Sequence, residues 1–391
     1  MYPKIFYTLC AVGFLITILY GMSNPILPLF AQIDLQASVA LIGLIISSFS
    51  LFRIFFELPF GYISDKIGRR TPIIASLFIT VTATISCGFV LDSYQLIVAR
   101  ALWGLGSSFF YSAASALLMD VFDPQIRGKA LGILVGMETG GSLFGSLWGG
   151  YLVDLFHNFR IVFFISGLIL IPAIVPCFLS KELKTLGSKE RTRTQKENTP
   201  SSFKSLKSLR LIFVCVIAFL IFLIYQGVIL TVLPLYAYND LQMDVSLIGV
   251  LMSAAGIGLF LSPFMAGFVS EKIGRKKFLF TAIVFLSISM YLLSFARSFE
   301  SLLPLLIFAG FAKGCVLALG PIMAVEATNF MAKGAAIGAY RTSFGLGNVV
   351  GPVVMAVLAA SSIPLAHNFA AVAALVTLVP VMAFSLQKAK K

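Results

Sequence analysis

Twelve stretches of mostly apolar residues, each long enough to form a membrane-spanning helix, constrain this chain more than any other feature. A helix needs about 20 such residues to cross a hydrocarbon core of about 30 Å, and there it satisfies its own backbone hydrogen bonds. We therefore predict an all-α polytopic membrane protein with twelve transmembrane helices. They are expected at residues 5–30, 40–63, 72–91, 95–119, 130–153, 160–180, 211–236, 245–269, 278–296, 301–325, 334–360 and 366–386.

The composition excludes most soluble classes of protein. Hydrophobic residues make up 59% of the 391 residues and charged residues only 12%, whereas about a quarter of a soluble protein is charged. The sequence contains no phosphate-binding loop of the kind that binds ATP. Its 5 cysteines are isolated within predicted helices, without metal-ligand or disulfide spacing. We therefore predict that the chain is not an enzyme, binds no metal and needs no cofactor.

The basic residues predict the orientation of the helices. If the N-terminus is cytoplasmic, 23 of the 29 Lys and Arg residues lie in cytoplasmic segments, and only Arg160 and Arg297 lie in outer loops. Lys and Arg accumulate in the cytoplasmic loops of membrane proteins. We therefore expect a multi-pass protein of the plasma or inner membrane with both termini in the cytoplasm. The net charge of +13 then reflects topology, and we expect the lipid bilayer rather than nucleic acid as a partner.

The two halves of the chain are repeats of each other. A shift of 206 residues aligns residues 21–70 with residues 227–276, with 19 identities in 50 positions. Shared apolar composition does not explain this match, because polar positions coincide as well. We predict two homologous six-helix bundles, at 1–180 and 211–391, joined by a basic cytoplasmic linker at 181–210. Parallel repeats of this kind are typical of transporters.

A polar loop follows the second predicted helix and recurs after the eighth. Its sequence GYISDKIGRR, at 61–70, returns as GFVSEKIGRK at 267–276. Basic residues at a membrane surface explain the Lys and Arg residues, but not an acid at one fixed position between two glycines. The loop resembles the signature G-x-x-x-D-[RK]-x-G-[RK]-[RK] of the major facilitator superfamily. The matching residues are Gly61, Asp65, Lys66, Gly68, Arg69 and Arg70, with Glu271 and Arg275 in the repeat.

The resemblance extends over the whole chain and implies the major facilitator fold, in which two pseudo-symmetric six-helix bundles rock about a central cavity. In such a fold Asp65 would face the positive N-terminus of helix eleven across the two bundles. Arg69 would pair with an acid of its own bundle, which we expect to be Asp120. Asp120 and Arg127 also match the acid and the Arg-Gly pair that the family has after helix four. These bonds would close the cytoplasmic side while the outer side is open.

Helix five is rich in glycine. Glycines spaced four apart let helix backbones approach closely, so helix packing alone is one explanation. Their fuller spacing resembles the signature of proton-coupled drug antiporters within the superfamily, although Ser146 stands where that signature has proline. The resemblance implies antiport rather than uptake. The glycines of this motif are Gly132, Gly141, Gly145, Gly149 and Gly150.

Glu138 lies in the middle of helix five, on the same side of the helix as the glycines. A carboxylate inside a membrane is costly, so its presence indicates a function. We interpret Glu138 as a proton-binding residue and the proton as the coupling ion. The alternative is a static bond to a neighbouring hydroxyl group or arginine.

Glu57 is a second acid within a predicted helix. It follows Arg53 by four residues in helix two, so the two residues could form a local ion pair. Alternatively, because helices two and eleven face each other in the superfamily, Glu57 could bridge to Arg341 in the other bundle. Its position within the membrane makes Glu57 a second candidate for proton coupling.

Arg100 begins the sequence RALWGLG in helix four, which resembles the superfamily signature R-x-x-x-G-x-G. The resemblance implies that this arginine takes part in proton transfer. The alternative is that the long side chain extends to the nearby outer interface.

By the same resemblance, helices one, four, seven and ten line the substrate cavity. Aromatic, adaptable walls suit varied apolar substrates, so we predict export of small amphipathic or cationic compounds in exchange for protons. We expect the transporter to be a monomer. The alternative substrate is a small organic anion or metabolite, because the predicted helices contain four basic residues and only two acidic ones. Lys313 would then either pair with Glu138 or bind an anionic part of the substrate. The cavity candidates are Tyr20, Asn24, Tyr111, Gln226, Thr231 and Lys313.

Overall fold

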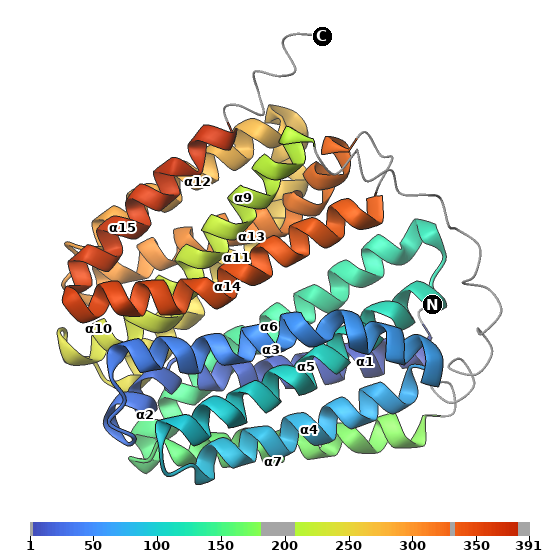
Figure 1. Cartoon of the computed structure of the whole chain (residues 1–391), viewed down its shortest axis with the longest axis horizontal. Coiled ribbons are helices and arrows are strands. Elements are labelled where there is room, and N and C mark those ends of the chain that lie inside the picture. The colour runs from blue at the N-terminus through green and yellow to red at the C-terminus, as the bar shows by residue number, and fades with distance from the viewer. Residues whose placement is uncertain (1–2, 181–207, 329–332, 382–391) are drawn as a thin grey trace. The chain divides into compact units, whose positions relative to one another are not determined.

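A computed structural model describes residues 3–180, 208–328 and 333–381 of the chain (Figure 1). Most of the predicted linker, residues 181–207, lies outside these described residues. Within them, 12 helices are long and apolar enough to cross a membrane, as the sequence predicts.

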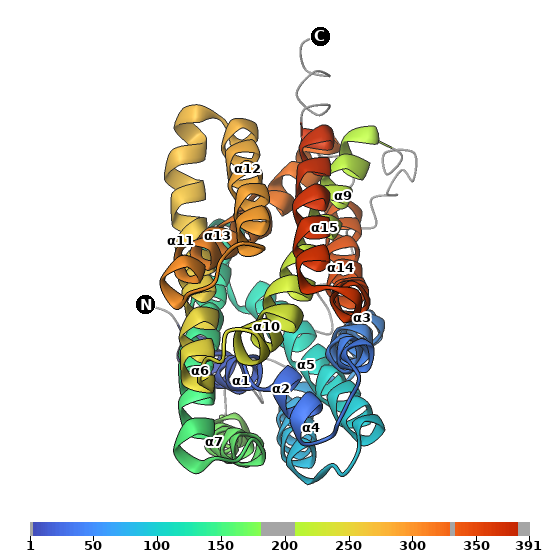
Figure 2. The ribbon, with the colours of Figure 1, turned by 90° about the vertical axis from the view of Figure 1, so that its left-hand side faces the viewer.

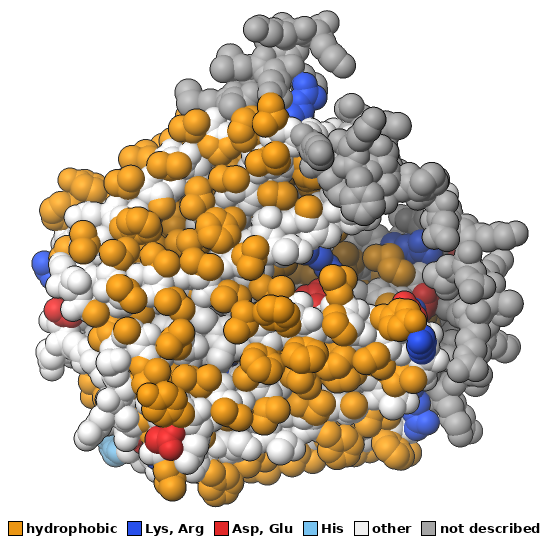
Figure 3. Space-filling view, viewed as in Figure 1, with side chains coloured by type: hydrophobic (Ala, Val, Ile, Leu, Met, Phe, Trp, Pro, Cys, Tyr) orange, Lys and Arg blue, Asp and Glu red, His pale blue; other side chains and the backbone are white. Residues whose placement is uncertain are grey.

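The outward-facing side chains of these helices are largely apolar. Leu58, Phe268 and Leu179 are 83%, 77% and 73% exposed, and hydrophobic side chains are spread across the face shown in Figure 3. A soluble protein rarely exposes so much contiguous apolar surface. Lipid tails are the environment that fits such a surface, and the chain is a multi-pass membrane protein.

Contacts between helices divide the described residues into two compact units. The N-terminal unit contains residues 3–37 and 48–180, and the C-terminal unit contains residues 38–47 together with those from 208 onwards. Residues 38–47 lie at the start of a helix whose remaining residues belong to the N-terminal unit. One helix therefore contributes to both units, which the sequence repeat does not predict.

In the N-terminal unit, α1 packs most extensively against α6, and α4 packs against α5 and α7. Figure 2 shows α1 beside α6 and α7. The helices are α1 (Lys4–Ser23), α2 (Leu27–Ile33), α3 (Val39–Ile67), α4 (Arg70–Phe89), α5 (Ser93–Val121), α6 (Pro124–Phe156) and α7 (Arg160–Leu179).

The C-terminal unit repeats these helix pairs. α9 packs against α14, and α12 packs against α13 and α15, so the sequence repeat is also a repeat of structure. The elements are α9 (Leu209–Ile224), a π-helix (Tyr225–Val232), α10 (Leu233–Asn239), α11 (Val245–Ile273), α12 (Arg275–Leu293), α13 (Phe299–Ala327), α14 (Lys333–Ser361) and α15 (Ile363–Val376).

The equivalent helices α5 and α13 begin at equivalent capping residues. Asp92 accepts hydrogen bonds from the backbone N–H groups of Tyr94 and Gln95, both at 2.8 Å, at the start of α5. Ser298, 206 residues later, accepts one from the N–H of Ser301 at the start of α13. Each cap satisfies a backbone donor that has no partner within the helix.

The first and seventh predicted helices differ from the expectation of continuous α-helices. α1 ends at Ser23 and α2 begins at Leu27, because Pro25 has no N–H to donate and disfavours helical geometry in the residue before it. At the equivalent position of the repeat, Thr231 can donate, and the chain continues through the π-helix. Such helices are rare and often occur at functional sites.

Candidate functional site

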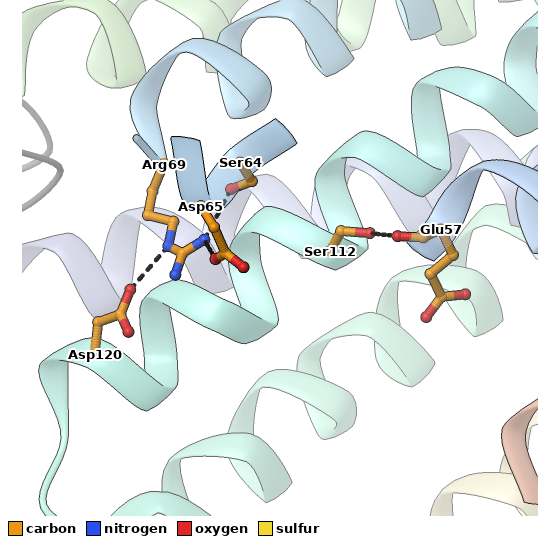
Figure 4. Close-up of polar contacts among 6 residues, drawn as sticks. All are labelled: Glu57, Ser64, Asp65, Arg69, Ser112 and Asp120. Carbon is orange, nitrogen blue, oxygen red and sulfur yellow. Dashed lines mark hydrogen bonds and ion pairs between the residues drawn. The ribbon is translucent and has the colours of Figure 1, made fainter. Parts of the chain in front are cut away.

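Ion pairs fold the loop between α3 and α4 within the N-terminal unit. Nε of Arg69 lies 2.8 Å from Oδ2 of Asp120 on α5, and the same guanidinium pairs with Asp65 and donates to Oγ of Ser64 at 3.1 Å. Figure 4 shows Arg69 between the two carboxylates. Burial alone would lower the pKa of Arg69, but the hydrogen bonds to Asp120 and Asp65 outweigh burial and raise that pKa. The expected pair of Arg69 and Asp120 is thus present, while its role in gating stays a prediction.

The C-terminal unit contains the same loop between α11 and α12. Arg275 pairs with Glu326 on α13, as Arg69 pairs with Asp120. In both loops a glycine, Gly68 or Gly274, has a positive φ, of 89° and 90° respectively. Residues with a Cβ rarely adopt this conformation, so glycine allows the sharp turn that starts the next helix. Glu271, the counterpart of Asp65, is exposed.

Three other basic residues of the sequence motifs, Lys66, Arg70 and Arg127, contact groups within the N-terminal unit. Nη2 of Arg70 donates to the backbone oxygen of Phe178 at 2.5 Å, and Nε of Arg127 donates to the backbone oxygen of Phe122 at 2.8 Å. Lys66 is exposed beside the ring of Tyr62. Arg70 and Arg127 therefore stabilise helix ends in the N-terminal unit.

A second polar group, here called the Glu138 cluster, consists of Tyr20, Arg53, Tyr111 and Glu138. Its members lie on four helices of the N-terminal unit: α1, α3, α5 and α6. Cζ of Arg53 lies 4.3 Å from the ring centroid of Tyr111, close enough for a cation–π interaction. Glu138 interacts electrostatically with both Arg53 and Tyr111, and Tyr111 also interacts with Tyr20. The cluster thus joins an acid, a base and two phenols inside the membrane.

The carboxylate of Glu138 lies against the backbone of α1. A Cβ atom on Gly13 would be 3.3 Å from Cγ and 3.4 Å from Oε1 of Glu138. Oε1 is buried and has no hydrogen-bond partner among the described residues. A buried acceptor without a donor raises the free energy of the folded state. Uptake of a proton or approach of a cation would relieve that cost.

The Glu138 cluster has no counterpart in the C-terminal repeat. At the shift of 206 residues, Phe344 takes the place of Glu138, Leu259 that of Arg53 and Leu317 that of Tyr111. The loop ion pairs, in contrast, occur in both units. Shared residues can serve the common fold and its movement, whereas residues of one repeat alone are candidates for a binding site. This comparison of the repeats is the sequence signal that would have assigned Arg53 to the site.

Glu57 and Arg341 belong to different units. The backbone oxygen of Glu57 on α3 accepts a hydrogen bond from Oγ of Ser112 at 2.8 Å, and Figure 4 shows its carboxylate pointing away from the Arg69 group. Arg341 is exposed on α14. The expected bridge between these two residues stays a prediction.

Arg100 is in the interior of the N-terminal unit. Its side chain is only 2% exposed, and Cζ lies 4.8 Å from the rings of both Phe49 and Trp103. The alternative that Arg100 extends to the outer interface is therefore wrong. The rings of Phe49 and Trp103 lie next to the guanidinium.

Three glycines of the helix-five motif hold α1 against α6. A Cβ atom on Gly141, Gly145 or Gly149 would lie 2.3, 2.2 or 2.1 Å from a backbone oxygen of α1, so no larger residue fits there. Gly150 is buried, whereas a Cβ on Gly132 would meet nothing within 4 Å. Packing between α1 and α6 accounts for the three central glycines, and their link to antiport stays a prediction.

The cavity candidates divide between the two units. Tyr20 and Tyr111 belong to the Glu138 cluster, and the N–H of Asn24 donates to the backbone oxygen of Tyr20 at 3.2 Å where α1 ends. In the C-terminal unit, buried Thr231 donates to the backbone oxygen of buried Gln226 at 3.0 Å. Both residues lie in the π-helix.

Lys313 on α13 packs on the start of that π-helix. Its Nζ lies 3.8 Å from the ring centroid of Tyr225 and 5.2 Å from that of Phe222. The sequence did not indicate Tyr225, because nothing in its apolar surroundings predicts a π-helix. The two aromatic rings stabilise the ammonium group within the membrane.

Comparisons with known proteins show the family. The profile of the Major Facilitator Superfamily matches residues 9–256 and 216–391, overlapping in the middle of the chain. The chain belongs to the major facilitator superfamily. It is therefore a membrane transporter for small-molecule substrates and not an enzyme.

Relatives within the superfamily include a multidrug resistance protein. MdtG of Salmonella typhimurium is 29% identical over 354 residues, which cover 88% of this chain and 85% of MdtG. An uncharacterized MFS-type transporter of Methanocaldococcus jannaschii is 27% identical over 363 residues, which cover 90% of this chain and 89% of the relative.

Solved structures confirm the major facilitator fold. The peptide transporter POT in complex with sulfate has a TM-score of 0.80 at 15% identity, over 98% of this chain and 95% of POT. A bacterial homologue of the lysosomal transporter Spinster, inward-facing and occupied, has a TM-score of 0.80 at 16% identity, over 97% and 96% of the two chains. At these identities the likeness shows the fold alone.

Proposed function

We propose that this superfamily member exports small amphipathic or cationic compounds in exchange for protons, and that Glu138 binds the proton. The observation that supports this most is the buried Oε1 of Glu138, which has no hydrogen-bond partner among the described residues. The acid also belongs to a cluster that only one repeat contains. Similarity to MdtG, whose name assigns it to multidrug resistance, supports efflux.

Exchange follows from competition for one carboxylate. Either a proton or a cationic substrate can neutralise a charged, buried carboxylate. The two compete, because the carboxylate has only one negative charge. When Glu138 is protonated, Arg53 loses its attraction to the acid but keeps its contact with the ring of Tyr111. The cluster thus has two charge states with different affinities for a cation, which is the requirement for coupling.

Alternating access needs a gate at the membrane surface. We infer that the loop ion pairs, Arg69 with Asp120 and Arg275 with Glu326, stabilise the cytoplasmic ends of the helices within each unit. Asp65, whose side chain is 63% exposed, and the proposed bridge from Glu57 to Arg341 would then act between the units. This scheme assumes a monomer with cytoplasmic termini in the plasma or inner membrane.

An organic anion is the second candidate substrate. The observation that favours it is the ammonium group of Lys313, which lies over Tyr225 inside the C-terminal unit. A planar anion could contact both the charge and the aromatic rings of this site. In that case Lys313, and not Glu138, would determine the substrate.

Flux into vesicles with an imposed pH gradient separates the two candidates. We expect purified protein in vesicles to move a lipophilic cationic dye against its gradient when a pH gradient is applied. Glu138→Gln removes the titratable group and should abolish this movement. Glu300→Gln, which neutralises an exposed acid in the first turn of α13, is the matched control and should retain it.

The opposite result would identify an organic anion as the substrate. Carboxylate flux that Lys313→Ala abolishes, with no dye movement, would favour the organic-anion candidate. Dye movement that needs no pH gradient would remove Glu138 from the proposed role.

A further inference from the structure

In the part of the chain that the structure describes, Arg100 is a buried cation without a carboxylate beside it. Among the described residues, the titratable groups that act on it electrostatically are Cys87 and Tyr20, and neither is a carboxylic acid. The side chain is 2% exposed, so bulk water does not compensate its charge. An uncompensated charge inside a membrane protein is costly, and such residues usually pair with an opposite charge.

The aromatic neighbours of Arg100 compensate only part of this cost. Phe49 and Trp103 each lie 4.8 Å from Cζ, and their rings attract a cation. Aromatic rings accept hydrogen bonds only weakly, however. Nε and Nη1 are buried without an acceptor among the described residues. The guanidinium therefore presents a positive charge and N–H donors, and its described neighbours supply no acceptor.

The packing around Arg100 limits the size of an acceptor. The rings of Phe49 and Trp103 lie 6.2 Å apart, and that of Tyr20 lies 5.4 Å from Phe49. A Cβ on Gly104, in the next turn of α5, would lie 2.2 Å from the backbone oxygen of Phe49, so α3 and α5 are in close contact. Such close packing excludes a drug-sized molecule, so an acceptor beside Arg100 has to be a small ion.

We propose that Arg100 binds a small monovalent inorganic anion, such as chloride, between α1, α3, α4 and α5. The anion accepts hydrogen bonds from the guanidinium N–H groups and neutralises its charge. Arg100 then holds a bound anion inside the N-terminal unit, a different role from the proton transfer that the family resemblance implies. The site shares Tyr20 with the Glu138 cluster but does not contain Glu138, and it does not depend on proton exchange.

The two tryptophans of the chain make the site observable. Trp148 is 55% exposed and Trp103, beside Arg100, is 1% exposed, so Trp148→Phe leaves one buried reporter. Iodide quenches tryptophan fluorescence on contact, and a buried ring rarely meets iodide by collision. We expect iodide to quench Trp103 with a saturable dependence on concentration, and chloride to displace it.

Variants of Arg100 decide the assignment. Arg100→Gln in the Trp148→Phe background should abolish the saturable quenching, whereas Arg100→Lys, which keeps a charge, should weaken it about tenfold or less. Arg297→Gln is the matched control, because Arg297 lies over the ring of Tyr236 in the C-terminal unit, and it should leave the quenching unchanged. Quenching that is linear in iodide, or that persists in Arg100→Gln, would overturn the proposal.

Two further measurements keep the test independent of folding and of proton export. If Arg100→Gln does not fold, the parent protein should still melt at a higher temperature in chloride than in gluconate, because a ligand stabilises the folded state. Equal melting temperatures would count against the site. Glu138→Gln should keep the iodide effect, so failure of proton exchange and failure of the anion site are distinguishable.

Discussion

Glu138 depends for its position on Gly13, a residue without a side chain. A methyl group at Gly13 would lie 3.2 Å from Cδ1 of Leu134, 3.3 Å from Cγ of Glu138 and 3.4 Å from its Oε1. All three atoms belong to side chains, so the helix backbones need not move to admit the methyl group. The carboxylate, however, would be displaced from α1. Gly13 is therefore a positioning residue for the proposed proton site.

We expect Gly13→Ala to lower proton-driven dye export several-fold, because the displaced carboxylate meets Arg53 and Tyr111 in a different geometry. Its melting temperature should stay close to that of the parent. Gly136→Ala, on the same helix as Glu138 and with nothing within 4 Å of the added Cβ, is the control and should export normally. Equal export by Gly13→Ala and Gly136→Ala in the vesicle assay would contradict this role.

We expect a different result at glycines where an added Cβ would meet backbone atoms rather than side-chain atoms. In Gly141→Ala the added Cβ would lie 2.3 Å from the backbone oxygen of Phe14, so α1 and α6 have to separate. We expect a loss of about 1–3 kcal/mol of stability, as is usual for an overpacked contact. Thermal unfolding in detergent measures it. An unchanged melting temperature would show that the two helices are not in close contact.

The sequence reveals some residues of the site and conceals others. Glu138 is visible because an acid in an apolar helix is unusual. Arg53 is visible too, but its spacing of four residues points only to Glu57 on the same helix. Its contact with Tyr111 depends on how α3 packs against α5. The role of Gly13 is invisible in the sequence, because a glycine next to a carboxylate in space is not next to it in the chain.

At the scale of elements, the loops that begin α4 and α12 share one strained position. The φ angles of 89° at Gly68 and 90° at Gly274 are unfavourable for any residue with a Cβ. Gly68 also places Arg69 where it can reach both Asp65 and Asp120. The turn and the ion pairs of this loop are therefore one structure.

We expect Gly68→Ala and Gly274→Ala each to destabilise the protein by about 1–3 kcal/mol, the usual cost of such backbone strain. Gly61→Ala is the control, because Gly61 lies within α3 with nothing within 4 Å of an added Cβ. Its melting temperature should equal or exceed that of the parent, since alanine favours helix. If Gly68→Ala and Gly61→Ala have the same melting temperature, the positive φ at Gly68 is not required.

The helices could be predicted from apolar length, and their interruptions only in part. Asp92 and Ser298 are recognisable caps, and Pro25 is a recognisable breaker. The π-helix at Tyr225–Val232, which packs against α14, has no comparable signal in the sequence. It places Tyr225 under Lys313, so the part of the site that the sequence missed lies where the helix departs from regular geometry.

At the scale of the whole molecule, the repeat predicted two bundles, and the structure contains two units. The sequence could not show that residues 38–47 group with the C-terminal unit, because the division depends on contacts in space. Opposite charges on the two units, Glu57 and Arg341, provide a test of movement between them.

We expect Glu57→Arg and Arg341→Glu each to reduce export strongly, since each places two like charges at the proposed bridge. The double variant restores an opposite pair and should regain more export than either single variant. Export is measured with dye in vesicles, at equal protein content. A double variant no better than the worse single variant would exclude the pair.

Release of protons on substrate binding tests the central claim most directly. Purified protein in weakly buffered detergent solution should release protons when a lipophilic cation is added, because the cation displaces the proton from Glu138. The pH change should disappear in Glu138→Gln and persist in Glu300→Gln. Proton release of equal size in Glu138→Gln and the parent would show that substrate and proton do not compete for this carboxylate.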